Sequence, residues 1–294
     1  MNVMPLTLKA VTNTADDVIQ ANLDATLKMD YRPIEVRDVD LGPVSIVGAG
    51  PSLAWTYKQL VGDVVACNSA HDYLISKGVI PKYALVWDAH PIMQGILTPH
   101  KDVTYLLASR CHPSLFEKLK NYEVRVWHAI GGDEIEKRLI SSKRSEHLIP
   151  GGSASAMRAP YVAGAMGYQK EMHFFGIDSC YSDDEETHVN GSLTSQVRVR
   201  ILVCGKWFTV APWMAMQAQD AKFLFPRIQS MGVRIIVHGA GLIPYCASFM
   251  KGIETPDLKV SLRERARREM HGLIILYHEL RNSPQLLGGS HAGI

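Results

Sequence analysis

A glycine-rich turn follows the first strongly apolar segment of this 294-residue sequence, where residues 45–52 read SIVGAGPS. Gly48 and Gly50 allow a close backbone approach or a positive φ. Pro51 suits the first turn of a helix, and Ser52 places a hydroxyl beside that turn. Backbone N–H groups and the helix dipole could therefore hold a phosphate oxygen, although the turn is neither G-x-x-x-x-G-K-S/T nor a complete G-x-G-x-x-G. By itself the stretch is equally typical of a phosphate-binding loop and of a tight strand-to-helix turn.

Asn68 and Asp88 each follow an apolar segment that predicts a strand. Asn68 could hydrogen-bond a ribose or a base, or it could cap the next helix. Asp88, with His90 two residues on, could bind a divalent ion such as Mg²⁺ or orient a hydroxyl. Its alternative role is that of a loop aspartate that accepts nearby backbone N–H groups. Spacing alone does not decide between these roles.

Asp178 and His188 are the candidate catalytic residues. Asp178 ends the apolar segment 172–178, and His188 follows the acidic run 183–186. Together they could hold Mg²⁺ or supply a general base, whereas residues 183–186 alone are typical of a solvated acidic loop.

Gly152 and Ser153 lie at the start of a stretch of small residues, 151–168, which predicts a thin helix that can lie close to a sheet. The glycine supplies flexible backbone, and Ser153 is expected to be the N-cap. Pro160 is expected to kink or interrupt this helix.

All these candidates lie where predicted strands end, which makes the arrangement of the strands decisive. Strand-like segments alternate with helices that begin near Ser52, Ser69 and His112, and this alternation predicts an α/β fold with a mainly parallel sheet covered by helices on both faces. Because ligands of such sheets bind beyond the carboxyl ends of the strands, we expect the candidates to share one edge. The strand-like segments are 44–48, 63–68, 83–88, 103–109, 123–129 and 172–178.

The pattern divides the chain into three parts. Residues 1–42 are expected to form an N-terminal lead-in with a helix near residues 15–28, residues 43–252 the main domain, and residues 253–294 a C-terminal helix and tail. Within the main domain, residues 196–212 predict a β-hairpin that leaves the sheet. An amphipathic helix is predicted for residues 262–281.

Composition is typical of a soluble enzyme. The net charge of +2 gives no strong signal for nucleic acid, and no apolar run is long enough for a membrane span. The N-terminal residues lack the features of a secretory signal, so a cytoplasmic location is expected. Five scattered cysteines without a C-x-x-C pair indicate reduced thiols. The protein could form a homo-oligomer, but no pattern in the sequence specifies one.

The order of the motifs resembles the 6-hydroxymethylpterin diphosphokinase MptE-like family, which also includes motility accessory factors linked to flagellin glycosylation. The resemblance covers roughly residues 43–250 and is carried by IVGAGPSL at 46–53, GVIPKYALVWDAHP at 78–91, and the long stretch 151–188 that ends in GIDSCYSDDEETH. A more distant similarity is to the family 42 bacterial sialyltransferases, which share the G-x-G-P-S-L turn, a Cys-Asn pair and a strand that ends in G-I-D. Those enzymes use a lid histidine as base; segment 189–209 has no histidine here, and His188 is the stand-in.

The resemblance implies a Rossmann-like domain that binds a nucleotide or nucleotide-sugar at its strand ends. The residues that it assigns to nucleotide or phosphate binding are Gly48, Gly50, Pro51, Ser52, Asn68, Gly152 and Ser153.

Three functions are compatible with the resemblance. Glycosyl transfer from a nucleotide-sugar to a small-molecule or glycan acceptor is favoured. The sequence resembles two groups of proteins that are linked to sugar transfer, and no Walker-type lysine follows the glycines. Asp178 or His188 would deprotonate the acceptor hydroxyl. The first alternative is a Mg²⁺-dependent pyrophosphokinase that acts on a hydroxymethylpterin-like alcohol, with Asp88 and Asp178 positioning the metal against the phosphates of ATP or GTP. The second alternative is a nucleotide-binding domain without catalysis.

Overall fold

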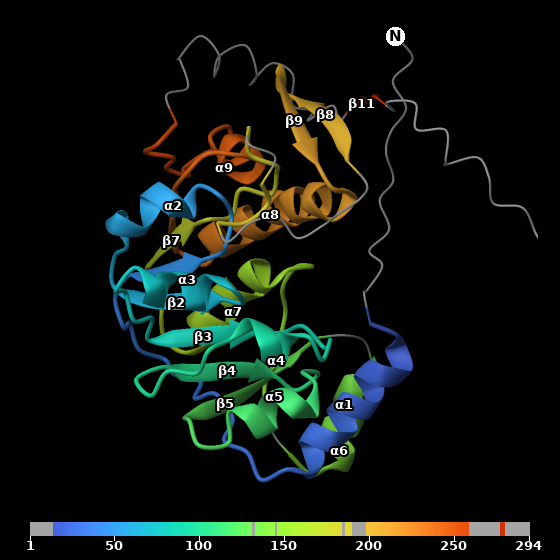
Figure 1. Ribbon diagram of the computed structural model, residues 1–294. Coiled ribbons are helices and arrows are strands. Elements are labelled where there is room, and N and C mark those ends of the chain that lie inside the picture. The colour runs from blue at the N-terminus through green and yellow to red at the C-terminus, as the bar shows by residue number, and fades with distance from the viewer. Residues whose placement is uncertain are drawn as a thin grey trace, which may run out of the picture.

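The computed structural model describes residues 14–130, 133–144, 146–183, 186–189, 198–258 and 277–279, and its centre is one parallel β-sheet (Figure 1). Within these residues eight strands form the sheet in the order β10-β7-β1-β2-β3-β4-β5-β6. The strands are β1 (Val44–Val47), β2 (Asp63–Cys67), β3 (Tyr83–Val86), β4 (Thr104–Ala108), β5 (Val124–Ala129), β6 (Leu148–Ile149), β7 (Glu171–Phe175) and β10 (Arg234–Val237). The predicted α/β, Rossmann-like sheet is thereby confirmed.

The strand order reverses at β1. From β1 the chain builds the sheet outward through β2 to β6, and it then returns to the other side of β1 for β7 and β10. The last residue of β1, Val47, consequently pairs with Ala66 of β2 on one side and with Phe175 of β7 on the other. In open parallel sheets such a reversal opens a crevice at the carboxyl ends of the strands, which is where ligands bind.

Helices cover both faces of the sheet because successive strand residues point to opposite sides. On β2, Val65 and Cys67 belong to the large core under α7 and α8, whereas Val64 and Ala66 belong to a smaller core under α2 and α3. Strands that are buried on both faces need nearly continuous apolar sequence, as β1 and β3 have. The helices are α1 (Asp16–Lys28), α2 (Leu53–Thr56), α3 (Ala70–Ser76), α4 (Met93–Ile96), α5 (Pro113–Lys118), α6 (Asp133–Ser141), α7 (Ser155–Ala165), α8 (Pro212–Ser230) and α9 (Leu242–Ala247).

The helix α1 packs against the β5 side of the sheet, next to α6 (Figure 1). Its Leu23 lies in one buried cluster with Ile135 and Leu139 of α6. Asn22, which is 4% exposed, donates hydrogen bonds from Nδ2 to the carbonyls of Ala89 and Arg110, at 3.1 Å each. The N-terminal helix therefore supports the loops that follow β3 and β4.

The predicted hairpin is present as β8 (Val199–Val203) and β9 (Lys206–Val210), and it lies beside α8 and α9, away from the sheet (Figure 1). Its two turn residues, Cys204 and Gly205, have φ values of 47° and 80°, which is the left-handed pair that a tight hairpin turn requires. The hairpin buries its inner face against α8 and α9 in a second core that includes Ile201 and Phe208.

Two local predictions are wrong. The helix of small residues begins at Ser155 with Ala154 as its N-cap residue, so Ser153 does not cap it, and the helix continues through Pro160. Most of the predicted C-terminal helix lies outside the described residues, but Tyr277–Glu279 form the strand β11, which pairs antiparallel with β8.

The described residues agree with two expectations from composition. All five cysteines are free, and four of them are buried. Within the part of the chain that the structure describes, no helix is both long and apolar enough to span a membrane.

Candidate functional site

The glycine turn after β1 crosses the turn after β7 at very short range. Gly50 donates its N–H to the carbonyl of Gly176 at 2.7 Å, and a Cβ on Gly48 would lie 2.5 Å from that same oxygen. A Cβ on Gly50 would lie 2.1 Å from Oδ2 of Asp178. Any side chain at these two positions would separate the turns, so the glycines are required by the close approach of β1 and β7.

Asp178 is the buried carboxyl group at this crossing, with only 4% of its surface exposed. Its Oδ2 accepts a hydrogen bond from the Ser52 hydroxyl at 2.9 Å and another from the Ser52 backbone N–H at 3.2 Å. Burial raises the pKa of Asp178 from 3.8 to about 7, and the two hydrogen bonds from Ser52 oppose this rise only in part. The donors of Ser52, which the sequence suggested for phosphate, are directed at this carboxylate.

Asn68 follows β2 in a left-handed conformation with φ 51°, which is uncommon for a residue other than glycine. Its Oδ1 accepts a hydrogen bond from the hydroxyl of Ser155, the first residue of α7, at 3.2 Å. The Asn68 side chain therefore contacts α7 and does not cap α3. Ser179 has a similar φ of 50°, and its hydroxyl donates to Oε1 of Gln217 on α8 at 2.7 Å. Two strained residues thus flank the same crevice, as is common at functional sites.

A cavity of about 120 Å³, here called the turn cavity, lies between these groups at the carboxyl ends of β1, β2 and β7. The structure brings five of the predicted site residues together in its lining. They are Gly48, Gly50, Asn68, Asp178 and His188. Their chain neighbours, the start of α7, and Trp213, Met214 and Gln217 of α8 complete the wall.

His188 reaches the turn cavity because its segment is tied to the glycine turn: the N–H of Val189 donates to the carbonyl of Ala49 at 2.9 Å. The Nδ1 of His188 contacts the Thr187 hydroxyl at 2.9 Å. Burial lowers the pKa of His188, so the imidazole is neutral at pH 7 and able to accept a proton.

A larger cavity of about 550 Å³, here called the hairpin cavity, lies on the other side of Asp178. Pro51 and Ser52 contribute to its wall. Trp55 of α2, which is 48% exposed, and Trp207 of the hairpin, which is 39% exposed, also line it. Lys206 and Arg198 add positive charge. Asp178 lines both cavities, so one buried carboxyl group separates a turn-lined space from an aromatic and basic one.

Gly152 and Ser153 lie outside both cavity linings. The hydroxyl and N–H of Ser153 donate to Oδ2 of Asp220 on α8, at 2.5 and 2.6 Å, and a Cβ on Gly152 would lie 2.7 Å from the same oxygen. These two residues thus join the loop before α7 to α8.

Asp88 also lies outside both linings, and its Oδ1 accepts the N–H of His90 at 2.9 Å, as an ordinary loop aspartate does. Among the described residues no group of three or more His, Cys, Asp or Glu side chains is placed to hold a metal ion. Magnesium binding by Asp88 therefore remains a prediction from sequence.

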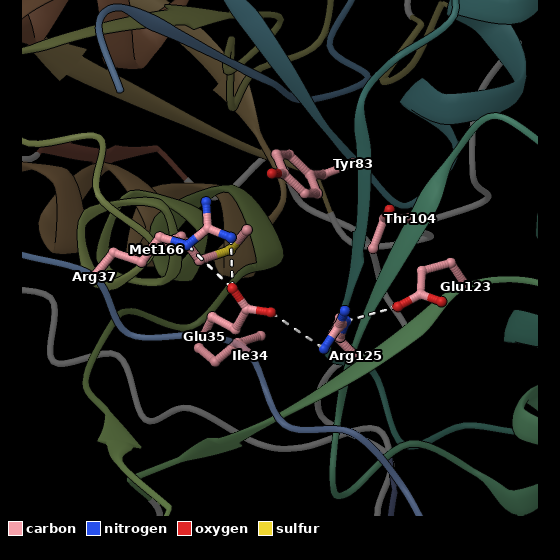
Figure 2. Close-up of a pocket in the computed structure, with 8 residues that line it drawn as sticks. All are labelled: Ile34, Glu35, Arg37, Tyr83, Thr104, Glu123, Arg125 and Met166. Carbon is pink, nitrogen blue, oxygen red and sulfur yellow. Dashed lines mark hydrogen bonds and ion pairs between the residues drawn. The ribbon is translucent and has the colours of Figure 1, made fainter. Parts of the chain in front are cut away.

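The opposite, amino-terminal edge of the sheet has a cavity of its own, also about 120 Å³ (Figure 2). Its charged side chains neutralise one another: Glu35 pairs with Arg37 and with Arg125, and Arg125 also pairs with Glu123. With its charges paired and no predicted site residue in its wall, this cavity is not a candidate reaction site.

Several residues of the site carry no recognisable signal in the sequence. Gln217 and Trp213 lie within the regular helix α8, and Gly176 and Ser179 flank Asp178 in a turn whose conformation no motif encodes. The hairpin was predicted from its strand pattern, and Trp207 on β9 becomes part of a cavity only because the fold places it across from the glycine turn.

Comparison with known proteins bears on the family and the fold of the chain. Residues 19–184 match the family model described as 6-hydroxymethylpterin diphosphokinase MptE-like. In structure the chain resembles the MAf glycosyltransferase from Magnetospirillum magneticum AMB-1, with a TM-score of 0.61 and 14% sequence identity over 89% of this chain. That likeness spans 42% of the neighbour, so the chain corresponds to less than half of that protein's length. A search of the curated proteins gave no match. Because the family model covers more than half of the sequence, including the glycine turn and Asp178, the chain belongs to the MptE-like family.

Proposed function

We propose that this protein is a glycosyltransferase that moves a sugar from a nucleotide-sugar donor to a hydroxyl of a small-molecule or glycan acceptor. The observation that carries the proposal is the position of Asp178, a buried carboxyl group with a pKa of about 7 between two cavities. A general base works best when its pKa lies close to the working pH, and buried carboxyl groups reach that range in active sites. The family name and the name of the structural neighbour both denote transferases.

The turn cavity is the proposed site of the donor nucleotide. The Asn68 side chain can meet a ribose or base at its rim, and the backbone of Gly48 and Gly50 permits close approach of the phosphates. His188 lies in the same wall and, being neutral, is the second candidate for proton transfer.

The hairpin cavity is the proposed site of the acceptor. The indoles of Trp55 and Trp207 offer broad, partly exposed faces on which a sugar or another ring can pack. An acceptor hydroxyl placed beside Asp178 would give its proton to the carboxylate as its oxygen forms the new bond to the sugar. The bond between the sugar and the phosphate oxygen breaks in the same step, and the nucleotide leaves with that oxygen. Ser52 holds Oδ2, so Oδ1 is the proposed proton acceptor.

The second candidate function is pyrophosphoryl transfer, which the family description favours. It would require Mg²⁺ near the phosphates of ATP or GTP. In that reaction Asp88 and Asp178 would position the Mg²⁺ against the phosphates.

Thermal unfolding with CMP, UDP, GDP, ATP and GTP, each with and without Mg²⁺, separates the two functions. A rise in Tm with a nucleotide product such as CMP or UDP, independent of Mg²⁺, supports glycosyl transfer. A rise that needs both ATP or GTP and Mg²⁺ supports the pyrophosphokinase. No change with any of the nucleotides contradicts the proposed donor site.

Turnover is then tested with Asp178→Asn and a matched control. Release of free nucleotide from the nucleotide-sugar that binds should be lost in Asp178→Asn while nucleotide binding is kept. The control Asp38→Asn makes the same change at an exposed carboxylate outside both cavity linings and should remain active. An active Asp178→Asn would remove this residue from the reaction, and binding without turnover in the native protein would identify a non-catalytic nucleotide-binding domain.

A further inference from the structure

Two arginines contact one tryptophan at the carboxyl edge of the sheet, outside both cavity linings. Trp87 directly follows β3, and the guanidinium carbons of Arg158 and Arg110 lie 3.8 and 4.3 Å from the centre of its ring. Arg158 comes from α7 and Arg110 from the loop after β4. Stacking on an indole holds a guanidinium group in place but does not satisfy the N–H donors in its plane.

Both side chains have buried donors that lack a partner. Arg158 is 8% exposed, and its Nε and Nη1 form no hydrogen bond; the Nε of Arg110 is likewise buried and unpaired. Gly151, with φ 153°, contributes to this burial, since a Cβ there would lie 2.6 Å from Cγ of Arg158. Leaving a charged donor buried and unpaired is costly, because the group has lost its water without gaining a partner.

The electrostatic surroundings agree with the missing partner. Burial and, to a smaller extent, the nearby positive charge of Arg110 lower the pKa of Arg158 to about 10, and the charge of Asp220 opposes this fall only in part. The pKa of Arg110 is also lowered by burial. The negative charges of Asp88 and Asp16 act on Arg110, and that of Asp220 acts on Arg158, but they offset burial only in part. Asp220 accepts both donors of Ser153, and Asp88 accepts the N–H of His90.

Other partly buried arginines of the described chain have carboxylate partners. Arg125, at the opposite edge of the sheet, pairs with Glu35 and Glu123 (Figure 2). Arg144 pairs with Glu146 in the same way. At Trp87, by contrast, the buried Nε and Nη1 of Arg158 and the buried Nε of Arg110 form no hydrogen bond.

We propose that Arg110 and Arg158 form a binding site for an oxyanion, the phosphate or carboxylate group of a ligand that lies along the carboxyl edge of the sheet. Guanidinium groups match the geometry of both anions, since two parallel N–H donors meet two oxygens. Trp87 and Arg110 are half-buried, so the site is reached from solvent. Trp87 follows β3, which is the neighbour of β2, and Arg110 follows β4, so the site lies one to two strands, about 5–10 Å at the usual strand spacing, from the strand that ends at Asn68. It goes beyond the proposed function, because it does not involve Asp178 or either cavity.

Binding of inorganic phosphate and of acetate to the full-length protein tests the site. Each anion is titrated in a chloride buffer while intrinsic tryptophan fluorescence and Tm are recorded. We expect phosphate, acetate or both to raise Tm, and the stronger anion tells whether the natural group is a phosphate or a carboxylate. In Arg158→Met and in Arg110→Met the Kd should rise at least roughly tenfold, as for the loss of a charged hydrogen bond.

Two controls isolate the arginine pair. Arg125→Met removes the same charge at the opposite edge of the sheet, and Asp178→Asn alters the proposed reaction site; both should bind the anion as the native protein does. Without anion, Arg158→Met should unfold at the same or a higher temperature than the native protein, because the substitution removes an uncompensated buried charge. If Arg158 only stabilised the fold, the same substitution would lower the Tm.

The proposal is overturned if the native protein responds to neither anion up to about 10 mM, or if Arg158→Met binds as tightly as the native protein. If both methionine variants fail to fold, Arg158→Lys keeps the charge but loses the paired N–H geometry, and it should still bind more weakly. Loss of the response in Asp178→Asn alone would place the anion at the reaction site and would also overturn the proposal.

Discussion

The raised pKa of Asp178 makes a quantitative prediction for stability. Between pH 3.8 and about 7 the folded protein keeps this carboxyl group protonated, while the unfolded chain has lost the proton. Because the folded state binds more protons over this interval, the stability contributed by Asp178 is fully present below pH 3.8 and is lost as the pH rises to about 7. At 1.36 kcal/mol per pH unit the loss amounts to about 4 kcal/mol. The group is almost fully buried, so solvent screening does not reduce this figure greatly.

Asp178→Asn removes the titration and keeps nearly the same shape, with an amide oxygen that can still accept from Ser52. The free energy of unfolding is measured by urea denaturation at several values between pH 4 and pH 8.5 for both proteins. The difference between them should change by about 4 kcal/mol across the range, in favour of the asparagine variant at high pH. Subtracting one protein from the other cancels the buried histidines, which titrate in both.

A difference that stays constant from pH 4 to pH 8.5 would refute the raised pKa, and with it the argument that Asp178 is a base tuned to neutral pH. A difference that changes in the opposite direction would mean that the carboxylate is stabilised in the folded state by its hydrogen bonds more than burial destabilises it.

Three further substitutions test the positioning of the site. Gly50→Ala should lower the free energy of unfolding, measured by urea denaturation, by about 1–3 kcal/mol, because the new Cβ would meet the Asp178 carboxylate. The control Gly95→Ala places its Cβ in open space and should change this free energy by less than about 1 kcal/mol. Equal effects of the two substitutions would contradict the close crossing of the turns. Asn68→Gly relieves the positive φ but removes the oxygen that accepts the Ser155 hydroxyl, so the free energy of unfolding should change by less than about 1 kcal/mol. Nucleotide affinity should fall, and an unchanged affinity would exclude Asn68 from the donor site. Asn22→Ala leaves two buried carbonyls unpaired and should lower the free energy of unfolding by about 2–3 kcal/mol; an unchanged urea midpoint would show that water replaces the amide.

The arrangement of strands and helices could be predicted from sequence because local periodicity encodes it. Segments such as 44–48 and 63–68 are mostly apolar on consecutive positions, as a strand buried on both faces requires. The alternation of such segments with short helices then selects a parallel sheet, and the hairpin turn at Cys204 and Gly205 was expected from the same kind of local signal. Ser153 was wrongly predicted as an N-cap because its hydroxyl has a better partner, Asp220, which is 67 residues away in the sequence.

The parts of the site that could not be predicted depend on contacts between distant segments. The hairpin cavity exists because β9 lies beside the glycine turn, and Arg158 is buried because Gly151 passes over it. Neither arrangement leaves a periodic trace in the sequence. The carboxyl edge of the sheet could be named as the place of the site, since that follows from topology alone, but the grouping of its residues into two cavities could not.

The contact between Ser52 and Asp178 changes the interpretation of the glycine turn. From sequence the turn was either a phosphate cradle or a structural turn, and the two roles were treated as alternatives. In the structure the donors that would bind a phosphate, the N–H and hydroxyl of Ser52, hold a carboxylate. Gly50 permits this by leaving room for Oδ2. Because the same two donors stabilise the charged form of a buried acid, they keep the pKa of Asp178 near 7 rather than higher, and the turn thereby sets the strength of the proposed base as well as its position.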